Sequence, residues 1–135
     1  MPYLLAFSSA KFDVSKESPN PINPIAGESV LAWLRTALIA AHYQVTEAAP
    51  EDFGWLVEVR GGGASYMVVA SGDAQVTDAE IAWTIQVRKN RSLSDKLLGK
   101  NQLTVDDPLL GVVERTLRVA DGIRNISGGI FPGPG

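Results

Sequence analysis

The sequence predicts an α+β fold: a two-layer sandwich whose mostly antiparallel sheet of about five strands carries two main helices on one face. Residues 81–88 alternate between apolar and more polar side chains, as in a strand with one side against the core and the other facing water. Two segments have apolar residues at helical spacing, and Gly61-Gly-Gly63 supplies a tight hairpin turn. One-sided strands are typical of antiparallel sheets covered on one face.

The N-terminal third predicts a strand, a connector and a helix. Short apolar runs predict a strand over residues 3–8 that resumes over 12–14. Three prolines within residues 18–27 exclude a helix there, because proline fixes φ and biases the preceding residue toward extended backbone. Residues 28–42 have the spacing of a helix, and Trp33 adds apolar surface on a second side of it.

The central region predicts a series of strands. A strand is expected over residues 43–46, and a hairpin pairs 56–60 with 65–71 across the three glycines. The alternating segment that ends at residue 88 completes the sheet.

The C-terminal third predicts two helices and a tail. A short helix over residues 94–98 ends at Gly99, and Asp106-Asp-Pro108 begins the second main helix, which closes near Gly122. We therefore expect one domain over residues 1–126 and a Gly/Pro-rich tail over 127–135, held if at all by Ile130 and Phe131.

Composition bounds the possible chemistry. The chain has 135 residues, 45% of them hydrophobic and 20% charged, as in an ordinary globular domain. It has no cysteine, which excludes disulfides, zinc–thiolate sites and thiol nucleophiles. The N-terminus resembles no secretory signal and no segment is long enough to cross a bilayer, so we expect a cytoplasmic protein without membrane contact. No metal or nucleotide motif is present in the sequence, so we expect no cofactor.

Charge is divided unevenly along the chain. Residues 1–87 carry 4 basic and 10 acidic side chains, a balance of −6, whereas residues 88–135 carry 8 and 5, a balance of +3. The densest basic run faces only Asp95 and comprises Arg88, Lys89, Arg91, Lys96 and Lys100. It is either a solvated loop with a short helix or a docking patch for an acidic partner or phosphate-bearing ligand. Nucleic acid is disfavoured because no aromatic residues are interleaved with the run.

Candidate catalytic residues are few. Glu51 and Asp52 lie beside two aromatic residues, where a partly buried carboxylate could act as a general acid or base. The simpler interpretation is an acidic turn before a strand, with the aromatic residues anchored in the core. His42, the only histidine, belongs to no recognisable catalytic pattern and is better explained as a residue at a helix C-terminus.

Two stretches resemble a known group of sequences. Asn20-Pro-Ile-Asn-Pro-Ile-Ala-Gly27 and Glu51-Asp-Phe-Gly-Trp55 resemble motifs of a family of small uncharacterised bacterial proteins, over about residues 11 to 120. Members of that family tend to have tryptophan where this chain has Phe53. The resemblance implies a bacterial origin and one compact domain, and it transfers no catalytic residue.

Two functional hypotheses follow. The leading one is a non-catalytic module that binds a protein partner or a second copy of itself, through the helix around Trp33 and the basic residues Arg88, Lys89 and Arg91. The alternative is an enzyme or small-ligand binder in which Glu51 or Asp52 is the acid/base group and the same basic residues hold an anion.

Overall fold

All strands of the described residues, 2–73 and 80–130 of the computed structural model, belong to one antiparallel sheet. The elements follow one another as β1 (Tyr3–Ser9), a 3-10 turn (Val14–Lys16), β2 (Ile25–Ala26), α1 (Glu28–Ala40), β3 (Gln44–Val45), β4 (Ala49–Glu51), β5 (Gly54–Gly61), β6 (Ala64–Asp73), β7 (Ile81–Lys89), α2 (Leu93–Leu98), α3 (Pro108–Val119) and β8 (Ile123–Ile130). The predicted α+β class with a mostly antiparallel sheet is confirmed.

The sheet has eight strands, so the prediction of about five is wrong. Its main path runs β3-β5-β6-β7-β1-β8, while β2 pairs with β6 and β4 pairs with β5. The additional strands β2 and β4 have only two and three residues, too few to show an alternating pattern. They are strands because β2 pairs with β6, which is distant in the sequence, and β4 pairs with β5, which follows it directly.

The C-terminal strand β8 was missed because Ser127-Gly-Gly129 has the composition of a loop. In the structure Leu5 of β1 pairs with Gly128, and Tyr3 pairs with Ile130. A Cβ atom on Gly128 would lie 2.7 Å from Leu5 Cδ2, so this glycine allows the close approach. Residues 127–130 are therefore part of the sheet rather than of a tail. Residues 131–135, including Phe131, lie outside the described residues.

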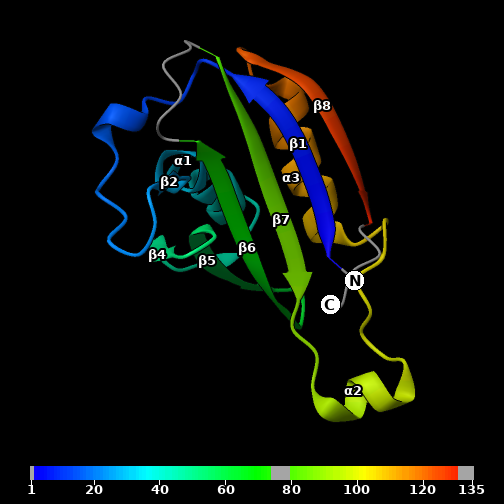
Figure 1. Ribbon diagram of the computed structural model, residues 1–135. Helices are drawn as coiled ribbons and strands as arrows, with labels where there is room; N and C mark the ends of the chain where they lie inside the picture. Colours follow the sequence, from blue (N-terminus) through cyan, green and yellow to red (C-terminus); the bar gives the residue numbers. More distant parts are fainter. Residues whose placement is uncertain (1, 74–79, 131–135) are drawn as a thin grey trace.

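The core lies between the sheet and two helices. Figure 1 shows α1 and α3 on the same side of the sheet, whereas α2 stands beyond its end. The alternation predicted for β7 is confirmed, since Ile81, Trp83, Ile85 and Val87 are buried and Ala82 is exposed. The helices contribute a matching set of fully or almost fully buried side chains: Val30, Leu31, Leu34, Leu38, Leu109, Leu110, Val113 and Leu117. Burial of each leucine favours folding by roughly 1.5–3 kcal/mol.

The first strand does not resume over residues 12–14 as predicted. Phe12 leaves the sheet and is buried in the core, with its ring edge-on to those of Trp33 and Trp83 at centroid distances of 5.4 and 5.8 Å. Asp13 then caps a 3-10 turn by accepting from the Ser15 amide at 3.0 Å. Aromatic packing against α1, rather than strand pairing, fixes this segment.

Two glycines allow α1 and β5 to approach β6. A Cβ atom on Gly27, at the start of α1, would lie 2.3 Å from the Ala70 carbonyl oxygen, and one on Gly54 would lie 2.4 Å from the same atom. Backbone atoms cannot move aside as a flexible side chain can, so both positions require the absence of a side chain.

We predict that Gly27→Ala lowers the free energy of unfolding by about 2–3 kcal/mol, because the added methyl group overlaps backbone atoms. Gly111→Ala is the matched control: Gly111 lies within α3 with open space around it, so the substitution should stabilise the protein by about 0.5–1 kcal/mol. Denaturant unfolding of both variants tests the prediction, and equal effects would contradict it.

Candidate functional site

The segment between β7 and α3, residues 90–106, extends away from the rest of the protein, and we call it the arm. Figure 1 shows α2, the helix of the arm, beyond the end of the sheet. The predicted short helix and its closure at Gly99 are confirmed: Ser92 and Asp95 form a capping box, and Gly99 is left-handed with φ of 66°. No residue of α2 is buried, so local capping rather than core packing stabilises this helix.

The arm exposes large apolar side chains. The exposed fractions are 74% for Leu93, 78% for Leu97 and 65% for Leu98, and Val105 on the return segment reaches 71%. Scattered exposed apolar residues are common, but four within 13 positions form a concentrated apolar surface. Sequence reasoning missed this feature because apolar residues at helical spacing normally indicate a face that packs on the core.

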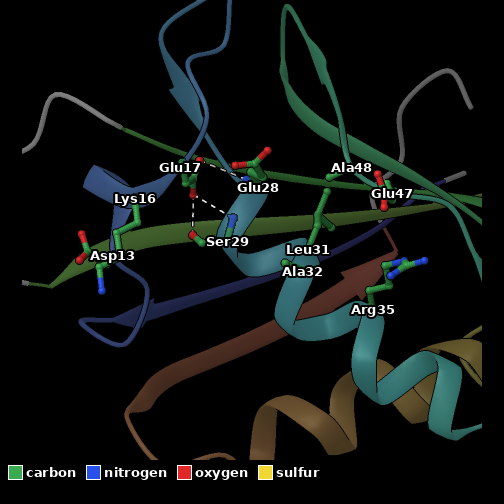
Figure 2. Close-up of a pocket in the computed structure, with 10 residues that line it drawn as sticks. All are labelled: Asp13, Lys16, Glu17, Glu28, Ser29, Leu31, Ala32, Arg35, Glu47 and Ala48. Atoms are coloured by element: carbon green, nitrogen blue, oxygen red, sulfur yellow. Dashed lines mark hydrogen bonds between the residues drawn. The ribbon is translucent and has the colours of Figure 1, made fainter.

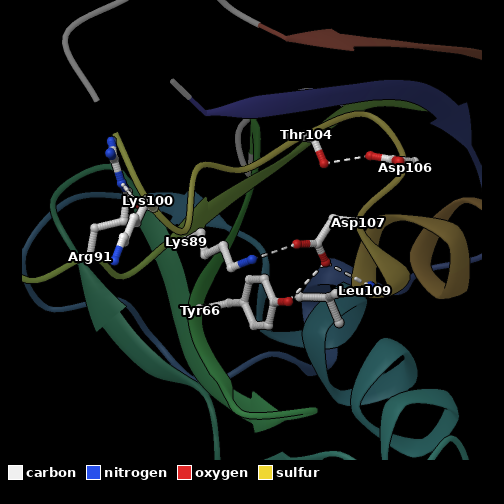
Figure 3. A network of polar contacts seen from close by, with 8 residues as sticks. All are labelled: Tyr66, Lys89, Arg91, Lys100, Thr104, Asp106, Asp107 and Leu109. Atoms are coloured by element: carbon white, nitrogen blue, oxygen red, sulfur yellow. Dashed lines mark hydrogen bonds and ion pairs between the residues drawn. The ribbon is translucent and has the colours of Figure 1, made fainter. Parts of the chain in front are cut away.

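A buried carboxylate closes the root of the arm (Figure 3). Asp107, which is only 5% exposed, accepts from the Tyr66 hydroxyl at 2.8 Å and from the Leu109 amide at 3.0 Å, and its second oxygen lies 3.1 Å from Lys89 Nζ. Lys89 ends β7 and Asp107 caps α3. This ion pair therefore joins the residues that precede and follow the arm.

The same environment affects Tyr66. Burial raises the pKa of its hydroxyl well above the usual range, and the hydrogen bond to the Asp107 carboxylate raises it further. The neutral phenol is thus the form that the fold stabilises.

Arg91 fixes the conformation of the arm. Its Nε donates to the Lys100 carbonyl at 3.0 Å and its Nη2 to the Asp95 carbonyl at 3.2 Å, so it links the two sides of the arm. Hydrogen bonding to the Ser92 backbone, the largest cause, holds the pKa of the Asp95 carboxyl below its usual range. A helix end and an arginine thus order a segment that has no core of its own.

The predicted basic residues come together. Arg88, Lys89 and Arg91 line one pocket of about 240 Å³ at the root of the arm. Arg88 lies opposite Met67 in the β6–β7 pairing. If the Gln86 amide is oriented with its oxygen toward Arg88, that oxygen accepts from Arg88 Nε at 2.8 Å and Nη2 at 3.0 Å.

The predicted acidic residues are part of a different assembly. Asn20 Nδ2 donates to the Glu51 carbonyl at 3.0 Å and to the Gly54 carbonyl at 3.1 Å, while Asn23 Nδ2 donates to the Asp52 carbonyl at 2.9 Å. The Asn-Pro-Ile-Asn-Pro and Glu-Asp-Phe-Gly-Trp stretches, 31 positions apart in the chain, therefore form one unit. We call it the asparagine clamp, and its contacts use the backbone carbonyls of the acidic turn.

The acidic turn and the basic pocket lie apart. Glu51 pairs with Gly54 at the start of β5, whereas Arg88 lies two strands away from β5, on the row of Met67 and Glu58. Neither Glu51 nor Asp52 is among the residues that line the basic pocket. The structure thus does not bring together the acid/base and anion-holding groups of the alternative hypothesis.

Trp33 is less available than its sequence position suggested. It is half-buried against the core, edge-on to Phe12, and Lys11 Nζ lies 5.8 Å from its ring centroid. On α1, Ile39 is a large apolar side chain that is exposed, at 46%. His42 follows the helix with φ of 71° and donates its amide to the Ile39 carbonyl, so its backbone closes α1.

A second pocket, of about 420 Å³, lies beside the start of α1 (Figure 2). The Glu17 carboxylate accepts from the amides of Gly27, at 3.0 Å, and Ser29, at 3.0 Å, and so occupies the position where a helix N-terminus attracts an anion. Charges of both signs surround this pocket, including Lys16 and Glu47. It therefore shows no preference for a ligand of one charge.

The described residues contain neither a group of three or more side chains suited to a metal ion nor a helix long and apolar enough to cross a membrane. Comparison with protein-family models, curated proteins and solved structures found no match.

We predict that the stabilising contribution of the Tyr66 hydroxyl is lost at high pH. Because its folded-state pKa is raised, the contribution is complete below about pH 10, the usual tyrosine value, and decreases above it as the unfolded chain binds fewer protons than the folded one. Tyr66→Phe should lower the free energy of unfolding by about 1–2 kcal/mol at pH 7, and the difference from wild type should shrink between pH 10 and 11. A difference that stays constant over pH 7–11 in denaturant unfolding would contradict the prediction.

Proposed function

We propose that the protein is a non-catalytic protein-interaction module, built as a two-layer sandwich, that binds its partner through the arm. One observation carries the proposal: Leu93, Leu97 and Leu98 are each about two-thirds exposed or more on a helix with no buried residue. Removing one such leucine from water favours binding by roughly 1.5–3 kcal/mol. A partner that covers all three gains roughly 4.5–9 kcal/mol toward the cost of association.

The ordered conformation of the arm favours this role. Short helices without a core are marginal in water, yet α2 has a complete capping box, a left-handed glycine end and the Arg91 bridge. The leucines are thus held in one arrangement before any partner arrives, and an ordered surface loses less entropy on binding.

Charge indicates the chemistry of the partner. Lys96 lies beside Leu97, and Lys100 follows Leu98 by two positions. The three ion pairs found among the described residues, Lys89–Asp107, Arg118–Glu114 and Arg124–Glu80, include neither lysine. We therefore propose a protein partner with an apolar groove bordered by carboxylates, because such a groove complements both the leucines and the lysines.

The proposal keeps the interaction role expected from the sequence but moves the binding surface. A dimer through Trp33 would require a side chain that already packs on Phe12 and the core. The three leucines of α2 are more exposed than Trp33, and none of them belongs to the core.

We predict that a photo-crosslinking residue, benzoylphenylalanine, placed at position 97 forms a discrete crosslinked product in the cells that produce the protein. The same residue at position 119 is the matched control, since Val119 is 76% exposed and Leu97 is 78% exposed, but Val119 lies at the end of α3. The position-97 product should weaken strongly in the Lys96→Glu/Lys100→Glu background, because those changes oppose an acidic groove. The mass of the product distinguishes a second copy of this chain from a different protein, and both support a protein partner.

Equal labelling at positions 97 and 119, or no product at 97, would overturn the proposal. Leu97→Ser provides the folding control: with 78% of the side chain already exposed, its free energy of unfolding should stay within about 0.5 kcal/mol of wild type.

A further inference from the structure

The pocket at the root of the arm has an unusual charge composition. Its walls include four basic side chains, Arg88, Lys89, Arg91 and Lys96, together with the apolar Met67 and Leu103. Among the described residues, no carboxylate-bearing side chain lines this pocket. Four cations around about 240 Å³ repel one another unless a counter-charge lies between them.

One of these charges is neutralised inside the fold. Lys89 pairs with the buried Asp107 at 3.1 Å. Two of the others have neutral partners: Arg91 donates to two backbone carbonyls, and the Arg88 guanidinium faces the Gln86 amide. The Lys96 side chain takes part in none of the three ion pairs found among the described residues.

The Asp95 carboxylate, which interacts with Arg91, does not cancel the excess. The Asp95 carboxylate accepts from the Ser92 amide at 3.1 Å as part of the α2 capping box, and its coulombic interaction with Arg91 is the smallest cause of its lowered pKa. Counting Arg88, Arg91 and Lys96 against Asp95 gives 3 − 1, an excess of two positive charges at the pocket.

We propose that this pocket is a binding site for a small phosphate monoester. A phosphate monoester carries about −1.5 to −2 at pH 7, which matches the excess, and its oxygens suit guanidinium donors held in fixed positions. Met67 and Leu103 provide an apolar wall for the organic part of the ligand. The site rests on the basic pocket, which shares Lys96 with the proposed partner surface but contains none of the leucines that carry the protein interaction.

Rigidity supports the assignment. The two hydrogen bonds of Arg91 to the Lys100 and Asp95 carbonyls fix the plane of its guanidinium, and Arg88 stands on a paired strand between β6 and β1. Pre-positioned cations lose little side-chain entropy when an anion binds.

Titration with phenyl phosphate, followed by the backbone amide NMR signals of residues 67 and 88–96, tests the site. We expect saturable shifts confined to the pocket, weaker binding of inorganic phosphate, which lacks the ring, and weaker binding of benzoate, which has the ring but a single charge. Arg88→Gln should weaken phenyl phosphate binding by about tenfold, the cost of one charge-assisted contact.

Matched controls separate a built site from general attraction. Arg115→Gln removes an exposed charge on α3 outside the pocket, and Leu97→Ser removes an arm leucine; both should leave the dissociation constant unchanged. Arg88→Gln is the decisive variant because Arg88 lies on a strand, whereas Arg91→Gln would also loosen the arm. No saturable shifts, equal loss with Arg88→Gln and Arg115→Gln, or benzoate binding as tightly as phenyl phosphate would overturn the proposal. None of these results depends on crosslinking at position 97.

Discussion

The buried Asp107 carboxylate is the constraint on which the functional end of the molecule depends. It caps α3, accepts the Tyr66 hydroxyl from β6 and pairs with Lys89 at the end of β7. A carboxylate so nearly excluded from solvent is stable only while these donors surround it. Its position therefore fixes the start of α3 relative to the sheet and brings the two ends of the arm together. The exposed helix and the basic pocket beside it both follow from this closure.

Around the acidic turn and the start of α1, backbone hydrogen bonds and close backbone packing hold the segments together, and none of the three ion pairs found among the described residues lies there. The asparagine clamp joins the proline-rich connector to the acidic turn, and the Trp55 indole donates to the Ile25 carbonyl at 3.2 Å. Gly27 and Gly54 then allow both segments to approach the Ala70 carbonyl. The acidic turn is thereby held by its backbone, which explains why the two unusual sequence stretches occur in one chain without implying catalysis. The backbone of Glu51 and Asp52 thus has a structural role. Of the two aromatic residues expected to anchor this turn in the core, Trp55 does so, whereas Phe53 is 49% exposed.

Local signals predicted much of this fold. Gly62 and Gly63, with φ of 60° and 77°, make the predicted tight turn, and the Asp-Pro start of α3 follows directly from capping rules. Non-local features were not predictable in the same way. Strand β8 depends on pairing between Tyr3 and Ile130, and the clamp on contacts made by Asn20 across 31 and 34 positions. Similarly, the spacing of Leu93 and Leu97 cannot distinguish a face that packs on a core from one that remains in water; only the placement of the arm beyond the sheet distinguishes them.

An exposed apolar helix has a cost, and the structure shows how that cost is limited. Three leucines in water favour collapse onto the body, yet the arm stays extended because Arg91 and the capping box satisfy its backbone while Asp107 anchors its base. Leu103 is buried, so the return segment contacts the core even though α2 does not. The arm is therefore held by the hydrogen bonds of Arg91, by the Asp107 ion pair at its base and by the buried Leu103, while α2 stays exposed. Holding the three leucines away from the core of their own chain does not help the protein to fold. Their ordered exposure is therefore the strongest physical reason to assign the arm a role in binding.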